Sequence, residues 1–80
     1  MSESPNPDLL LDLKGLLCPM PIVKISQAIK QVAVGGLIQA TATDPGVLAD
    51  IPAWTKSTGH DLVKMERGAG IITFWVRRAK

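Results

Sequence analysis

Glycine and proline residues divide this chain into short segments, and that division most constrains how it can fold. Some segments alternate apolar and polar residues, which is typical of a strand with one buried face, and others repeat apolar residues at steps of three and four, which is typical of an amphipathic helix. The chain has 80 residues, enough for one small domain. We therefore expect a single domain over residues 9–80 that follows a disordered N-terminal tail, residues 1–8.

The alternating segments predict four strands. These strands cover residues 9–14, 37–43, 60–67 and 71–78. A short turn at residues 68–70, with the sequence Gly-Ala-Gly, joins the last two strands as a hairpin. In the last strand, Ile72, Phe74 and Val76 share one face, and Trp75 lies on the other, outer face of the sheet. That outer face is partly apolar and can serve docking or self-association.

The steps of three and four predict two helices. The first starts at Pro19 and Pro21, which a first helical turn tolerates, and Gly35 and Gly36 end it. The second runs over residues 45–58 with Trp54 on its apolar face, but Pro52 inside it removes a helical hydrogen bond. We expect a break near Asp50, with Asp50 capping the second piece.

The element order is β-α-β-α-β-β, which predicts an α/β fold. Right-handed crossovers place both helices on one face of a four-stranded mixed sheet, in a two-layer α/β sandwich. The first three strands are then parallel to one another, and the fourth is antiparallel.

Composition excludes several kinds of site. The chain contains one cysteine and one histidine, so an internal disulfide and a closed zinc site of Cys and His ligands are excluded, and we expect no metal. A lone thiol without a secretion signal is typical of a cytoplasmic protein. A net charge of +2 is slight, and the basic C-terminal tip is expected to be solvated, so neither a nucleic-acid partner nor a membrane is expected.

The residues best suited to a reactive site are Cys18-Pro19-Met20-Pro21, at the predicted junction between the first strand and the first helix. A thiol at a helix N-terminus meets the positive end of the macrodipole, so we expect a moderate lowering of the pKa of Cys18 and a reactive thiolate. The prolines remove first-turn donors and stiffen the turn. The alternative is a small buried structural cysteine beside Leu16 and Leu17.

Sheet geometry indicates which side chains lie near Cys18. Asp44 follows the second strand and Arg67 precedes the hairpin turn at the same edge, although Asp44 is also a candidate helix cap. Lys24 lies further along the first helix and supports the site or is simply exposed. His60 opens the third strand at the opposite end of the sheet, so a Cys-His pair is not expected.

The segment from Asp12 to Pro21 resembles the signature of the TusA/SirA-like sulfur-carrier family, in which a glycine precedes Cys-Pro-x-Pro by three residues. The similarity continues through Lys24, residues 43–46 (Thr-Asp-Pro-Gly), residues 50–54 (Asp-Ile-Pro-Ala-Trp) and residues 58–60 (Thr-Gly-His). It covers roughly residues 9 to 78.

The resemblance implies a two-layer α/β sandwich and a carrier whose Cys18 accepts a sulfane sulfur as a covalent persulfide and passes it on. It implies no other cofactor and no stand-alone catalysis. The donor would be a cysteine desulfurase or a rhodanese, and the acceptor a sulfur-relay protein in tRNA thiolation, molybdenum-cofactor biosynthesis or sulfur oxidation. The carrier itself is expected to be a monomer.

The other candidate residues are expected to support Cys18. Gly15, Pro19 and Pro21 shape the turn, and Asp44 supports it. Lys24 and Arg67 favour the anionic persulfide or dock an acidic partner. An apolar rim for partner contact consists of Leu16, Leu17 and Met20.

Two other hypotheses remain open at this point. The first is an RNA- or protein-binding regulatory module in which Cys18 is structural. The second is a redox sensor that forms a covalent dimer through Cys18 under oxidation.

Overall fold

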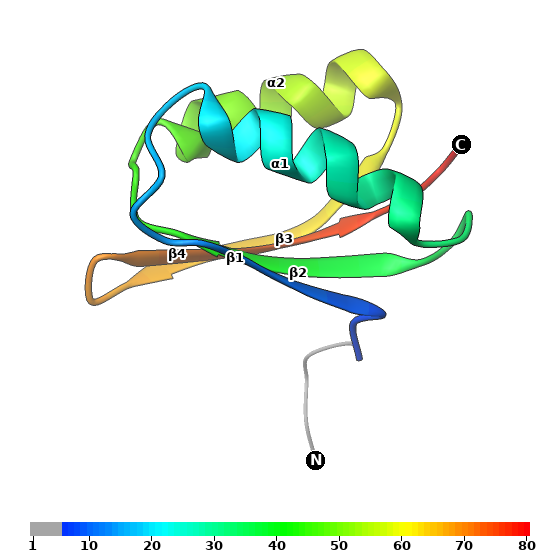
Figure 1. Cartoon of the computed structure of the whole chain (residues 1–80), viewed down its shortest axis with the longest axis horizontal. Helices are drawn as coiled ribbons and strands as arrows, with labels where there is room; N and C mark the ends of the chain where they lie inside the picture. The colour runs from blue at the N-terminus through cyan, green and yellow to red at the C-terminus, as the bar shows by residue number, and fades with distance from the viewer. Residues whose placement is uncertain (1–5) are drawn as a thin grey trace.

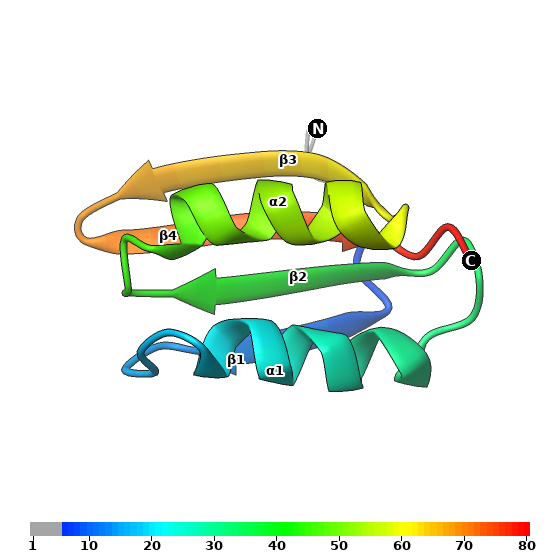
Figure 2. The same cartoon turned by 90° about the horizontal axis from the view of Figure 1, so that it is seen from above.

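Two helices cover one face of a four-stranded sheet in the computed structural model, which describes residues 6–80 (Figure 1). The elements are β1 (Leu9–Leu13), α1 (Met20–Ala28), a 3-10 turn (Ile29–Gln31), β2 (Leu37–Ala42), α2 (Val47–Thr58), β3 (Asp61–Gly68) and β4 (Ile71–Arg77). Seen from above, α1 lies over β1 and α2 lies over β4 (Figure 2). The predicted two-layer α/β architecture is confirmed.

The strands lie in the order β1-β2-β4-β3. β2 is parallel to β1 and antiparallel to β4, and β4 is antiparallel to β3. The first three strands therefore run in one direction, as the right-handed crossovers predict. Leu13 pairs with Ala42 at the carboxyl ends of β1 and β2, so the two loops that follow these strands start side by side.

The core lies between the sheet and the helices. Alternate strand residues point into it because side chains of a strand alternate between the faces of the sheet. Its fully buried members include Leu13, Ile25, Ile38, Ala40, Ala42, Val47, Ile51, Phe74 and Val76. Trp54 is partly buried and packs against this core, as predicted from its helical face.

Trp75 lies on the opposite, outer face of the sheet, as predicted, yet it is only 3% exposed. Its indole Nε1 donates to Gln39 Oε1 at 3.2 Å, and Lys64 Nζ lies 5.4 Å from the ring centroid. A tryptophan that has a hydrogen-bond acceptor and a cation over its ring is satisfied within the chain. The indole is therefore not the exposed apolar surface that the sequence suggested on this face.

The first helix ends earlier than predicted. Its regular turns stop at Ala28, the 3-10 turn stops at Gln31, and Val32 is already extended. The Arg78 guanidinium donates to the Val32 carbonyl at 2.7 Å, and Gly35 N–H donates to the Arg78 carbonyl at 2.7 Å. The C-terminal segment thus supplies hydrogen-bond partners for the backbone at this end of the helix, and the helix stops before the glycines.

The predicted break in the second helix is wrong: α2 is continuous through Pro52. Pro52 removes one donor, but Val47, Ile51 and Thr55, at successive steps of four, are all buried, and this packing holds the helix together. Asp50 does not cap a second piece; it lies in the first turn, and its N–H donates to the Gly46 carbonyl at 2.9 Å. Gly59 ends the helix in the left-handed region, with φ +85°, as predicted.

Residues 1–5, most of the predicted tail, lie outside the described residues. At its end, Asp8 donates its N–H to the Leu37 carbonyl at 2.7 Å and accepts the Leu37 N–H on Oδ2 at 2.9 Å. Within residues 6–80, none of the helices has the length and apolar character needed to cross a membrane.

Phe74→Ala tests the assignment of strand faces. Phe74 is fully buried, so its truncation should lower the free energy of unfolding by about 3–5 kcal/mol. Ile71→Ala, on the outer face of the same strand, is the matched control and should cost less than about 1 kcal/mol. Urea denaturation followed by tryptophan fluorescence measures both, and equal costs would contradict the faces described here.

Candidate functional site

The loop that joins β1 to α1 carries the cysteine. Gly15 has φ +83°, a backbone conformation that glycine adopts without steric cost. Leu16 then turns inward and packs against the core, whereas Leu17 points to solvent and is 71% exposed. Met20 is also exposed, so two residues of the predicted apolar rim are on the surface, and Leu16 belongs instead to the core.

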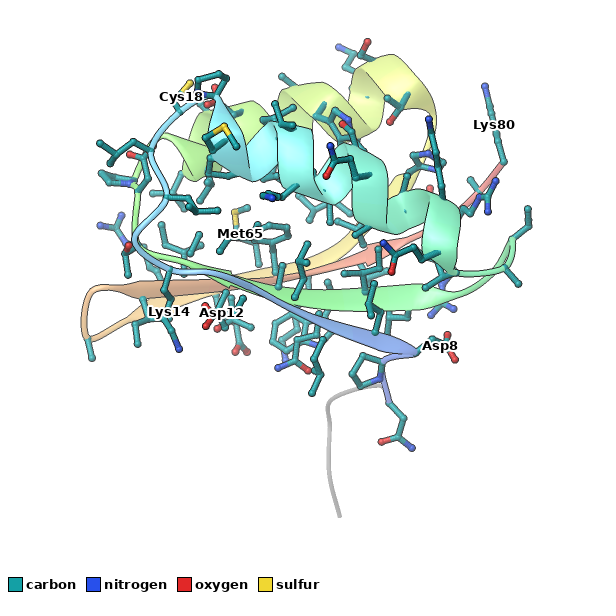
Figure 3. The ribbon with its side chains drawn as sticks, viewed as in Figure 1. Asp8, Asp12, Lys14, Cys18, Met65 and Lys80 are labelled. Carbon is teal, nitrogen blue, oxygen red and sulfur yellow. The ribbon has the colours of Figure 1, made fainter. Side chains whose placement is uncertain are left out.

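Cys18 is exposed. It lies two residues before the first residue of α1, Met20, with Pro19 at the N-cap and Pro21 buried in the first turn. In Figure 3 its side chain is at the level of the helices, above the end of the sheet where β1 stops. The alternative of a cysteine buried as a small apolar residue is therefore wrong for this structure.

Asp44 fixes the backbone of the cysteine. Its carboxylate Oδ2 accepts the Cys18 N–H at 3.0 Å, and its Oδ1 accepts the Gly46 N–H at 3.2 Å. Thr43 adds a second link, because its Oγ1 accepts the Gly15 N–H at 2.9 Å. The β1–α1 and β2–α2 loops are thus held together by side chains of one loop bound to the backbone of the other, and Asp44 lies beside Cys18 as the sheet-edge argument predicts.

The electrostatic expectation for the thiol is wrong in direction. The pKa of the Cys18 thiol is raised above its ordinary value, chiefly by interaction with the Asp50 side chain, and further by partial loss of water around the sulfur and by the charges of Asp50 and Asp44. A carboxylate next to a thiol disfavours the thiolate, since both are negative. The prediction considered the backbone dipole of α1 alone.

Asp50 is the residue that the sequence analysis missed as a neighbour of the cysteine. It lies in the first turn of α2, four residues after Gly46, and residues at this spacing share a helix face. Asp44 ties Cys18 to Gly46 at the start of this helix, and Asp50 is one of the two acids that raise the pKa of the thiol. The signal was an acidic residue in the first turn of a helix that follows the second parallel strand.

The basic residues proposed for the site lie further out. Lys24 is exposed on α1. Arg67, near the end of β3, lines a groove of about 370 Å³ with Thr43, Pro45 and the hairpin turn. The structure thus brings Arg67 next to the loop that holds Asp44, but the charged groups that act on the thiol are the two acids.

His60 is at the far end of the molecule, as predicted. Its Nδ1 accepts the Ala79 N–H at 3.0 Å, and Lys80, the next residue, lies at the opposite end of the structure from Cys18 in Figure 3. Burial and the charges of Arg78 and Lys80 lower the pKa of His60. Among residues 6–80, no group of three or more His, Cys, Asp and Glu side chains is arranged to hold a metal ion.

Known proteins similar to this chain are described as sulfur carriers or sulfurtransferases. A family profile described as "Sulfurtransferase TusA" matches residues 10–78. YrkI of Bacillus subtilis is 42% identical over 71 residues, which are 89% of this chain and 95% of that protein. The sulfur carrier protein TusA of Pseudomonas putida F1 is 39% identical over 73 residues, 91% of each chain.

A solved structure shows the same fold. The crystal structure of a SirA-like protein from Desulfitobacterium hafniense superposes with a TM-score of 0.76 and covers 90% of this chain and 99% of that one. The sequence identity is 16%, so this likeness concerns the fold alone.

Gly15→Ala tests the turn before the cysteine. A Cβ at Gly15 would meet no atom within 4 Å, so only the positive φ opposes it, and the free energy of unfolding should fall by about 1–2 kcal/mol. Gly68→Ala is the matched control, because a Cβ there is also unobstructed and φ is outside the left-handed region. Urea denaturation compares the two, and equal stability would contradict this account of the turn.

Proposed function

The chain belongs to the TusA family of sulfur carrier proteins, and from this membership we propose that Cys18 receives a sulfane sulfur as a persulfide and hands it to a partner protein. The observation that carries the proposal is the position of the chain's single cysteine. It is exposed at a strand-to-helix junction, and Asp44 anchors its backbone. A partner's sulfur can reach this atom without any movement of the core.

Each transfer is an exchange at sulfur. The Cys18 thiolate attacks the outer sulfur of a donor persulfide, a new S–S bond forms at Cys18 Sγ, and the donor's S–S bond breaks with the electron pair leaving on the donor thiolate. In the second step, an acceptor thiolate attacks the outer sulfur on Cys18, and Cys18 leaves as a thiolate. One sulfur atom moves, and no external oxidant or reductant is consumed.

A single thiol suits this role. A second cysteine nearby would attack the persulfide, release the sulfur and leave a disulfide. With one cysteine in the sequence, the loaded chain has no internal route to that loss. The donor is a cysteine desulfurase or a rhodanese, and the acceptor is a sulfur-relay protein whose identity decides whether the sulfur serves tRNA thiolation, molybdenum-cofactor biosynthesis or sulfur oxidation.

An exposed apolar surface flanks the thiol. Leu17, Met20 and Val23 are 71%, 39% and 39% exposed, and they belong to the loop of Cys18 and to the first turn of α1 that follows it. Large apolar side chains left in water next to a reactive atom are suited to contact with a partner protein. Lys24, exposed on the same helix, and Arg67, in the neighbouring groove, favour the approach of an anionic persulfide.

Mass spectrometry tests the transfer. Incubation with a cysteine desulfurase and L-cysteine should add one sulfur, about 32 Da, which dithiothreitol removes. Cys18→Ser should keep the fold and gain no sulfur, because the hydroxyl is not a nucleophile for this exchange. The proposal fails if the unmodified chain gains no sulfur from the desulfurase, from a rhodanese or from inorganic polysulfide.

Leu17→Ser separates docking from chemistry. Loss of the apolar contact should slow sulfur transfer from the desulfurase several-fold and leave loading by inorganic polysulfide unchanged, because the small reagent needs no docking surface. Val34→Ser, at a residue that is 63% exposed and belongs to the loop after the 3-10 turn, is the matched control and should change neither rate. Equal slowing with both reagents would show that Leu17 acts on the thiol and not on a partner.

A further inference from the structure

A cation occupies an inward-facing position near the end of β3. Residues directly opposite each other in an antiparallel pair lie on the same face of the sheet, and Arg67 is paired with Ile72, which is buried in the core. The preceding inward residue, Met65, is paired with Phe74 and packs against the core. Arg67 therefore lies on the face that the helices cover, where the alternation of the strand predicts an apolar residue.

The end of the sheet beside Arg67 is hollowed. Arg67 lines the groove of about 370 Å³, whose other lining residues come from the β2–α2 loop and from the turn between β3 and β4. In Figure 1 this turn and this loop lie at the same end of the molecule. The turn contributes no bulky side chain, because its sequence is Gly-Ala-Gly, and a Cβ at Gly68 or Gly70 would meet no atom within 4 Å. The groove is therefore open to a ligand.

Arg67 has no anionic partner in the described part of the chain. The ion pairs found within residues 6–80 are formed by Lys14 and Lys64, and the side chains of Arg77 and Arg78 donate to backbone carbonyls. A guanidinium presents its N–H donors in a planar fork that matches the two oxygens of a carboxylate. The donors of Arg67 are thus available to an incoming anion.

The other groove residues add a second kind of contact. Thr43 lines the groove, and its Oγ1 accepts the Gly15 N–H, so its own hydroxyl hydrogen can still be donated. Pro45, Ile71 and Ile72 make part of the lining apolar. A cation with an apolar wall beside it fits an acidic side chain that has an apolar neighbour in its own sequence.

Resting on the carrier function proposed above, we propose that this groove binds an acidic segment of a partner protein, with a Glu or Asp carboxylate on the Arg67 guanidinium and an adjacent apolar side chain against Pro45. Charge complementarity decides the chemistry of the segment, because the charged side chain in the groove lining is a cation without a carboxylate of its own.

The position of the groove gives such a contact a use. Thr43 and Pro45 line it, and Asp44, between them, accepts the Cys18 N–H at 3.0 Å. In Figure 2 the β1–α1 loop, the β2–α2 loop and the β3–β4 turn lie along the same end of the sheet. A partner that contacts both the groove and the exposed Leu17 spans the loop that anchors the cysteine, so the groove orients the partner's sulfur toward Cys18.

Two blocked peptides without sulfur, acetyl-Leu-Glu-Leu-amide and acetyl-Leu-Gln-Leu-amide, test the ligand chemistry by NMR titration of the isotope-labelled whole chain. At millimolar concentration the glutamate peptide should shift the backbone amide signals of residues 68–70, and it should bind about fivefold more tightly than the glutamine peptide. High salt should weaken this preference, because the groove is open to solvent. Equal binding of the two peptides, or no shift at residues 68–70, overturns the proposal.

Variants of the cation identify the residue that reads the charge. Arg67→Gln should abolish the preference for the glutamate peptide, Arg67→Lys should keep part of it, and Arg67→Glu should favour acetyl-Leu-Lys-Leu-amide instead. Lys30→Gln is the matched control: Lys30 is exposed in the 3-10 turn after α1, away from the groove, and its loss removes the same net charge. An unchanged preference in Arg67→Gln, or an equal loss in Lys30→Gln, would show that the groove does not recognise the carboxylate.

Inorganic phosphate, titrated at the same ionic strength, distinguishes a carboxylate site from a phosphate site. Stronger shifts at residues 68–70 with phosphate than with the glutamate peptide would point to a nucleic-acid or phosphorylated ligand and would overturn the assignment to an acidic segment. These titrations involve no sulfur, so their failure leaves the mass increase at Cys18 untouched. Conversely, a chain that binds the peptide but gains no sulfur would contradict the carrier function alone.

Discussion

The parallel pairing of β1 with β2 is the constraint on which the rest of the site depends. Leu13 lies opposite Ala42, so both strands stop at the same edge of the sheet, and the loops that follow begin side by side. Thr43 and Asp44 then bind the backbone of the other loop at Gly15 and Cys18. The sulfur is therefore exposed and yet well placed, because its position depends on hydrogen bonds to the backbone and does not require packing of the sulfur itself. This combination lets a small domain offer a reactive atom without opening its core.

Much of the fold could be predicted from the sequence, because each helix and strand shows its own hydrophobic period and several of them end at a glycine. Gly59, for instance, ends α2 in the left-handed conformation that its position suggests. The errors occurred where tertiary contacts override local preference. Pro52 does not break its helix, since buried residues on both sides of it hold the helix against the sheet. The first helix ends early because Arg78, far away in the sequence, binds the carbonyl of Val32. Neither contact is visible in a local pattern.

The site was predictable in its location but not in its electrostatics. The Cys-Pro-Met-Pro segment at a strand-to-helix junction located Cys18, and the parallel strand order located Asp44 next to it. Asp50 could not be recognised while its helix was expected to break there. The direction of the thiol's pKa was also missed, because reasoning from one helix dipole leaves out side chains from another element. The carboxylates of Asp50 and Asp44 both act to raise the pKa of the thiol, and two of the first donors of the helix end that would favour the thiolate are replaced by proline.

The antiparallel direction of β4 determines where this protein can be attached to another molecule or to a surface. It brings Lys80 back to the side of the sheet where β1 starts, so Asp8 and Lys80 both lie away from Cys18 (Figure 3). A fluorophore, a solid support or a fused enzyme joined at either place would leave the end of the molecule that carries Cys18 accessible. Such tethering raises the effective concentration of Cys18 near the attached molecule, and this effective concentration falls only slowly as the linker is lengthened.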